Sequence, residues 1–100
     1  MSPKIICAAI WYTDFDNQTG LPNNVSKGIV LAGRRHHNCI HTYYKLTGQT
    51  TKADDVHIQG FLTTDNRFVD RREGYLIAEA ANQILKPSDF PGVLYSEDIY

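Results

Sequence analysis

The sequence predicts one α+β domain in which a small antiparallel sheet of three to four strands has two helices packed on it. Short apolar runs, rich in Ile, Val and aromatic residues, are separated by turn-forming segments, which is typical of strands. Two further segments carry apolar residues at helical spacing. A chain of 100 residues has room for one core, so residues 1–100 are expected to fold as a single domain.

The first third of the chain predicts two strands joined by a long loop. Residues 4–12 have the Ile, Ala and aromatic content of a buried strand, and residues 25–32 predict a second strand, most simply antiparallel to the first. The intervening residues 13–24 collect Asp, Asn, Gly and Pro, which is turn chemistry in a segment too long for a tight hairpin. We expect this segment to be a mobile surface loop.

The middle of the chain predicts a short helix and a hairpin. Ile40, Tyr43 and Tyr44 fit one helical face, and Gly48 is expected to end that helix. After a polar connection at residues 49–55, residues 57–63 predict a third strand. A turn at residues 64–67 then leads into a short fourth strand at residues 68–69.

A second helix is predicted from Arg71 to about Leu85. Asp70 and Glu73 resemble a capping box at its start, and Pro87 is expected to end it. Its apolar stripe, suited to packing on the sheet, consists of Leu76, Ile77, Ala80, Ala81 and Ile84. The tail, residues 88–100, carries aromatic side chains around the pair Glu97 and Asp98, with a turn at residues 91–92. Exposed strand edges and this tail favour coverage by a second copy, so a homo-oligomer is expected.

Composition narrows the class of protein. The net charge of −1 argues against general nucleic-acid binding, which needs a broad basic surface. The longest apolar runs are too short to span a bilayer and no basic leader opens the chain, so we expect a cytoplasmic protein without membrane contact. Cys7 and Cys39 lack metal-ligand spacing and are expected to be small core side chains, with no disulfide.

The most distinctive local feature is a run of four basic or imidazole side chains, Arg34, Arg35, His36 and His37. They lie where a strand is predicted to turn into a helix. A helix start presents unpaired backbone N–H groups and a positive dipole end, and arginine adds planar donor pairs that match phosphate oxygens. The run therefore favours an anion site, while a solvated basic turn is the plainer alternative.

Two histidines suggest a metal only weakly. His37 and His41 are four residues apart and share one helical face, a spacing that suits two ligands of a zinc or nickel site. The sequence fixes no third ligand nearby. We therefore expect surface or interface histidines, with no metal and no cofactor.

Three segments, GRRHHNCI, QGFLTTDNRFVDRREGYLIAEAANQI and LYSEDIY, resemble a family of small phage and prophage proteins. The resemblance covers nearly the whole chain from Lys4. Small phage proteins of this size often counter host defence, and some sequester cyclic nucleotide or cyclic ADP-ribose signals. The resemblance therefore implies an anti-defence protein that binds a host immune nucleotide signal and removes it by sequestration.

A nucleotide ligand needs phosphate donors, a stacking surface and polar groups that read a base edge. The residues expected to supply them are Arg34, Arg35, His36, His37, Gln59, Phe61, Thr63, Arg67 and Arg71. For Phe61 and Phe68, two candidate stacking rings, a core position is the stronger alternative. No catalytic residue is assigned, because the histidine pair lies in one turn and no nucleophile setting is recognisable. Two other functions stay open, namely a metal-independent phosphodiesterase using His36 and His37, and an inhibitor that docks on a host protein through its tail.

Overall fold

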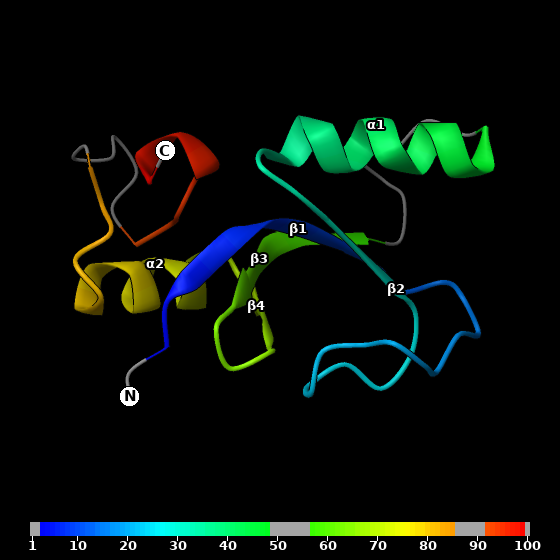
Figure 1. Cartoon of the computed structure of the whole chain (residues 1–100), viewed down its shortest axis with the longest axis horizontal. Coiled ribbons are helices and arrows are strands. Elements are labelled where there is room, and N and C mark those ends of the chain that lie inside the picture. Colours follow the sequence, from blue (N-terminus) through cyan, green and yellow to red (C-terminus); the bar gives the residue numbers. More distant parts are fainter. Residues whose placement is uncertain (1–2, 49–56, 86–91, 100) are drawn as a thin grey trace.

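The computed structural model describes residues 3–48, 57–85 and 92–99. It contains a four-stranded antiparallel sheet with the strand order β2-β1-β3-β4 and two helices (Figure 1). The predicted α+β fold is thus confirmed. The elements are β1 Ile5–Tyr12, β2 Ile29–Gly33, α1 His36–Thr47, β3 His57–Thr63, β4 Phe68–Asp70, α2 Arg71–Ala80 and a 3₁₀ turn, η1, Ser96–Asp98. The predicted connection at residues 49–55, the helix stop at Pro87 and the predictions for residues 88–91 and 100 lie outside the described residues.

Strand β1 forms the centre of the sheet. Ile10 lies opposite Leu31 of β2 on one side and Gln59 of β3 on the other. Since side chains alternate between the two faces of a strand, Ala8, Ile10 and Tyr12 share one face of the sheet. Ala9 and Trp11 occupy the opposite face. Both faces of β1 are covered, which explains the nearly continuous apolar run in its sequence.

Both helices pack on the same face of the sheet. Helix α1 covers its β1–β2 side, where Cys39 packs with Ile10 and Tyr12, and the rings of Tyr12 and Tyr43 stack 4.0 Å apart. Helix α2 covers the side of β3 and β4, where Ala78 packs with Phe61. None of the helices in the described ranges is long and apolar enough to cross a membrane.

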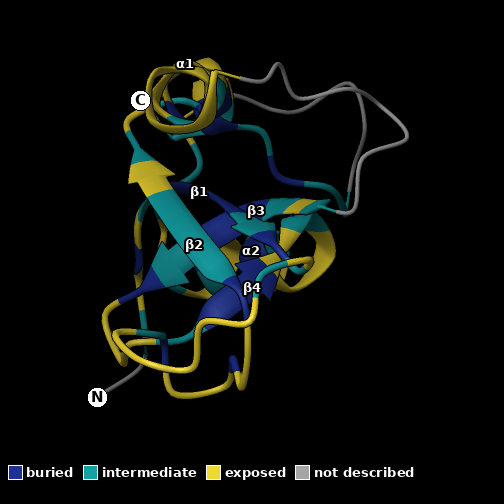
Figure 2. Cartoon of the chain, turned by 90° about the vertical axis from the view of Figure 1, so that its right-hand side faces the viewer, coloured by how far each residue is buried: buried dark blue, intermediate teal, exposed yellow. Residues whose placement is uncertain are grey.

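The opposite face of the sheet is covered by the long loop before β2. Val25 is buried there with Ala9 and Phe68, and Trp11 meets the Phe68 ring edge to face at 5.9 Å. The exposed outer side of this loop appears yellow in Figure 2. The loop therefore packs on the sheet through Val25. Its polar composition predicts only a surface loop.

Strand β2 begins four residues later than predicted, at Ile29 in place of Val25. The Val25 N–H donates to the carbonyl of Pro22 at 3.1 Å, so Val25 belongs to a turn. Gly28 has a φ of 113°, and a Cβ there would lie 2.6 Å from Trp11 Nε1. This left-handed glycine, pressed against the indole, brings the chain out of the loop and into the strand.

Helix α2 ends at Ala80, five residues before the predicted end at Leu85. Asn82 takes a left-handed φ of 60°, and the Gln83 N–H bonds the Ala78 carbonyl at 2.8 Å, which closes the helix. The predicted start is correct, because the Asp70 side chain accepts from the N–H groups of Arg72 and Glu73. Beyond the helix, Ile84 still packs against the core.

Gly60 is where the sheet has least room for a side chain. A Cβ at this position would overlap the Val69 carbonyl oxygen and lie 2.8 Å from Phe68 Cζ. We expect Gly60→Ala to lower the free energy of unfolding by roughly 3 kcal/mol or more, measured by urea denaturation. Gly20→Ala is the control: it has a left-handed φ of 69° but open space, so a cost of only about 1 kcal/mol is expected. Equal costs for the two variants would contradict this steric explanation.

Candidate functional site

The predicted basic run forms the start of helix α1. Arg35 is the extended residue before the first turn, and its N–H donates to Asn38 Oδ1 at 3.0 Å. Arg34 and His37 are exposed, whereas Arg35 is partly buried. The first turn of α1 contains no acidic residue. Positive side chains thus surround the positive end of the helix dipole, an arrangement that favours an anion.

His36 points inward from this turn and is buried. Its Nε2 donates to the Gly60 carbonyl at 2.7 Å, which leaves Nδ1 as the acceptor facing Arg71 at 3.4 Å. The ring also meets Phe61 edge to face at 5.1 Å. Burial lowers the pKa of His36, and the charge of Arg71 acts in the same direction against the opposing Gly60 carbonyl and Glu97. His36 is therefore a neutral structural residue at neutral pH.

Arg71, the first residue of α2, connects His36 to the rest of the chain. One terminal nitrogen donates to the Leu94 carbonyl at 2.9 Å and the other to Gln59 Oε1 at 2.7 Å. The guanidinium carbon lies 4.6 Å from the centre of the Tyr95 ring. Burial lowers the pKa of Arg71, opposed by the nearby Tyr95, Glu97 and Asp98. The Tyr95 ring therefore packs against Arg71 of its own chain.

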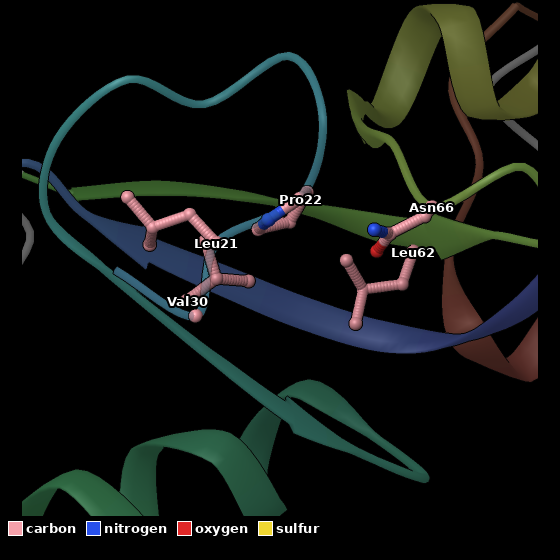
Figure 3. Close-up of a pocket in the computed structure, with 6 residues that line it drawn as sticks. Leu21, Pro22, Val30, Leu62 and Asn66 are labelled. Atoms are coloured by element: carbon pink, nitrogen blue, oxygen red, sulfur yellow. The ribbon is translucent and has the colours of Figure 1, made fainter. Parts of the chain in front are cut away.

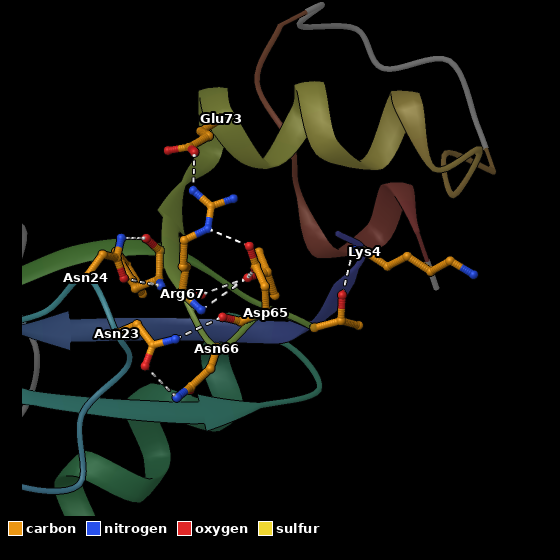
Figure 4. Close-up of polar contacts among 10 residues, drawn as sticks. Lys4, Asn23, Asn24, Asp65, Asn66, Arg67 and Glu73 are labelled. Carbon is orange, nitrogen blue, oxygen red and sulfur yellow. Dashed lines mark hydrogen bonds and ion pairs between the residues drawn. The ribbon is translucent and has the colours of Figure 1, made fainter. Parts of the chain in front are cut away.

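The hairpin between β3 and β4 holds a separate polar group (Figure 4). Arg67 Nε lies 2.8 Å from Asp65, and its terminal nitrogen lies 3.1 Å from Glu73. The Thr63 hydroxyl donates a hydrogen bond to the Asp65 carboxylate, and this bond is the main reason that the pKa of Asp65 is lowered. The hydrogen bond and the charge of Arg67 lower this pKa further. Two carboxylates, Asp65 in the hairpin and Glu73 on α2, thus compensate the Arg67 charge.

The structure divides the nine predicted site residues into two groups. The first gathers around the start of α1 and the adjoining part of β3 and α2, and consists of Arg34, Arg35, His36, His37, Gln59, Phe61 and Arg71. The second, in the hairpin, consists of Thr63 and Arg67. Phe61 is fully buried and Thr63 is 1% exposed, so neither presents a surface in this conformation. Arg67 pairs with Asp65 and Glu73, whereas Arg71 bonds Gln59 and Leu94, so the two arginines belong to different groups.

Sequence reasoning did not single out three groups that complete the first cluster, namely the Gly60 and Leu94 carbonyls and the Tyr95 ring. A glycine inside a strand is a recognised sign of close approach, so Gly60 offered a usable signal. Nothing local in the sequence marks Leu94, because its partner is 23 positions away.

The two helix starts differ in charge. At α2 the Asp70 carboxylate accepts from two first-turn N–H groups, and Glu73 adds a second negative charge. At α1 the flanking and first-turn residues are arginines, histidines and Asn38. One helix start therefore carries its own anion, and the other is surrounded by cationic or titratable donors.

A pocket of about 330 Å³ lies on the other face of the sheet (Figure 3). It is lined by Gly20, Leu21, Pro22, Val30, Leu62 and Asn66. Because Val30 and Leu62 point away from the helices, this pocket is not continuous with the start of α1. None of these lining residues carries a charge that could bind an anion.

The titratable side chains form no metal cluster in the described part of the chain, where no three His, Cys, Asp or Glu residues come together. His37 and His41 are both exposed on α1. Cys7 and Cys39 are free thiols. Burial raises the pKa of Cys39 to about 11, so this thiol stays protonated and acts as core packing.

Comparison with known proteins identifies one family. Residues 4–100 match the family described as "Phage T4 y16D protein". No curated protein and no solved structure matches the chain.

Removal of the Arg71 guanidinium tests its role as a connector. We expect Arg71→Met to lower the free energy of unfolding by about 3 kcal/mol, because it leaves polar groups of Gln59 and Leu94 unpaired. Hydrogen exchange at the Leu94 N–H, which donates to the Arg71 carbonyl at 2.9 Å, should accelerate. The exposed neighbour gives the control, since Arg72→Met should change stability by less than about 0.5 kcal/mol. Equal effects would refute the connector role.

The lowered pKa of His36 predicts an acid-sensitive fold. Below about pH 6.5 the unfolded chain takes up a proton at this imidazole that the folded chain does not. The free energy of unfolding should therefore fall by up to about 1.4 kcal/mol per pH unit between pH 6.5 and the folded-state pKa. His36→Gln should lose this contribution, whereas His37→Gln should retain it. Urea denaturation from pH 5 to 7.5 measures the difference, and an unchanged slope in His36→Gln would disprove the assignment.

Proposed function

The chain belongs to this phage protein family, and from that premise we propose that it binds a phosphate-containing small molecule at the start of α1. The ligand class that we propose is a host immune nucleotide signal of the cyclic nucleotide or cyclic ADP-ribose type. Binding would sequester the signal and so counter host defence. The observation that carries the proposal is the basic, acid-free start of α1, in contrast to the start of α2.

Arg34 and Arg35 are the proposed phosphate donors. The exposed Arg34 guanidinium can give two parallel hydrogen bonds to phosphate oxygens, and the partly buried Arg35 adds positive charge beside it. The first-turn N–H groups of α1 add to the positive field. The exposed His37 is the adjacent donor in the same turn. In this arrangement the ligand approaches α1 from solvent.

The other predicted ligand residues contribute indirectly in this proposal. His36, Gln59 and Arg71 bond to one another and to Gly60 and Leu94, so they fix the position of the first turn. A first turn that is held before the ligand arrives loses less conformational freedom on binding. We assign these three residues the role of positioning residues.

Substitution of the two arginines tests the proposal. We expect Arg34→Ala with Arg35→Ala to keep the fold and to weaken binding by at least about 100-fold, because each charged hydrogen bond contributes roughly 1.5–3 kcal/mol. Arg72→Ala, which removes an exposed arginine from the first turn of α2, is the matched control and should bind normally. Equilibrium dialysis against a panel of cyclic nucleotides and cyclic ADP-ribose isomers gives the affinities. Unchanged binding by the folded double variant would disprove the proposal.

The same panel separates sequestration from hydrolysis, which is the second function under consideration. Ligand that is depleted by the protein and recovered intact after heat denaturation indicates sequestration. Converted ligand indicates a phosphodiesterase, and its turnover should then disappear in His36→Gln with His37→Gln. Mass spectrometry of the released material distinguishes the two results. A protein that depletes no member of the panel would direct attention to inhibition of a host protein.

A further inference from the structure

The pocket on the loop-covered face of the sheet combines aliphatic walls with one polar end. Leu21 of the loop, Val30 of β2 and Leu62 of β3 supply aliphatic side chains, and Asn66, in the turn before β4, supplies the polar end (Figure 3). The volume of about 330 Å³ lies at the small end of the range of small-molecule sites in proteins, roughly 300–1,000 Å³. The pocket therefore has the size and the mixed lining of a site for a small organic molecule.

The loop wall of the pocket is held by hydrogen bonds to the hairpin of β3 and β4. The Asn23 N–H donates to the Asn66 carbonyl at 2.7 Å. The next residue, Asn24, bonds the backbone of Phe68 in β4, at the edge of the sheet: its Nδ2 donates to the Phe68 carbonyl at 2.6 Å, and its Oδ1 accepts from the Phe68 N–H at 2.8 Å (Figure 4). These bonds hold the two sides of the pocket apart before a ligand arrives, which lowers the entropy cost of binding.

A chain of amide hydrogen bonds fixes which atom of Asn66 is left for a ligand. Asn23 Nδ2 donates to the Asp65 carbonyl at 3.2 Å, so the Asn23 amide presents its oxygen to Asn66. That oxygen needs a donor, and Asn66 Nδ2 supplies it at 3.3 Å (Figure 4). Asn66 Oδ1 therefore remains as an acceptor, and no hydrogen bond within the described part of the chain uses it.

The acceptor is aimed into the pocket and can be reached from solvent. Figure 3 shows the Asn66 side chain extending from the turn toward Leu62 and Leu21. On the loop side, a Cβ at Gly20 would meet no atom within 4 Å, so this side of the pocket is open. A ligand that enters here meets aliphatic side chains and one carbonyl oxygen.

Charge decides which class of molecule the pocket takes. None of its lining residues is charged, and the nearby Arg67 is already compensated by Asp65 and Glu73. An ion would lose hydration on entry without gaining a counter-charge, whereas an uncharged molecule avoids this cost. We propose that the pocket binds an uncharged small molecule with a compact apolar body and one N–H or O–H group, which donates to Asn66 Oδ1.

A matched pair of probes tests this proposal on the wild-type protein. Indole is uncharged and compact and carries one N–H donor, whereas N-methylindole has the same rings without the donor. We expect indole to shift the amide NMR signals of Leu21, Val30 and Leu62 saturably, with a dissociation constant below about 1 mM. N-methylindole should bind at least about 3-fold more weakly, because it leaves Asn66 Oδ1 unbonded. The anion indole-3-carboxylate should give no saturable shift at these three residues.

Variants with matched controls test the named residues. Val30→Trp should fill the pocket and abolish indole binding, whereas Ile58→Trp, at a 40% exposed position on the same face, should retain it. Asn66→Gly removes the acceptor and tolerates the left-handed φ of 59°, so it should make indole and N-methylindole bind equally. Asn82→Gly, at another left-handed asparagine with a φ of 60°, should preserve the preference for indole.

Three results would overturn the proposal. The first is the absence of a saturable indole shift at the pocket residues, and the second is equal binding of indole and N-methylindole by the wild-type protein. The third is a change of the pocket signals with protein concentration alone, because a second copy would then occupy the site. No nucleotide enters these measurements, so they are scored separately from binding at the start of α1.

Discussion

The position of Arg71 determines how the helix-bearing half of the molecule is assembled. Its side chain joins the start of α2 to Gln59 in the sheet, to His36 at the start of α1 and to the segment that contains Leu94 and Tyr95. A partly buried cation requires several acceptors, and each of these comes from a different element. The polar requirements of one side chain therefore fix the relative positions of four parts of the chain.

This constraint explains why the basic run has two kinds of member. His36 is committed to the interior, where it is neutral and bonds Gly60. Arg34 and His37 are exposed on either side of it. An inward residue that is rigidly held gives outward neighbours a defined position, which is what recognition of an anion with few contacts requires.

Local sequence patterns predicted the elements whose ends are set by local chemistry. The bounds of β3 agree with the prediction, and the left-handed Gly48 ends α1 as expected. The start of β2 was missed because Val25 packs on the sheet from a turn. In the sequence, an apolar residue of this kind cannot be told from the first residue of a strand. The end of α2 was missed because a left-handed Asn82 stops the helix before any proline does.

The candidate site was only partly predictable, for a related reason. Arg34, Arg35, His36 and His37 are consecutive, so the sequence displays them together. The contact between His36 and Arg71 joins residues 35 positions apart, and no local spacing announces it. The burial of Phe61 also depends on α2, where Gly74 leaves room for its ring. Identity of a site residue was readable from the sequence, but its orientation was not.

The amide of Asn24 makes the fold sensitive to chemical ageing. Asparagine is a thermolabile residue, and hydrolysis of its side chain replaces the nitrogen donor by a second carboxylate oxygen. At this position the new oxygen would face the Phe68 carbonyl, acceptor against acceptor. The Asn24 side chain, which bonds the backbone of Phe68 in β4, would then repel the Phe68 carbonyl. A single spontaneous deamidation would therefore loosen this edge of the sheet without any change in the gene.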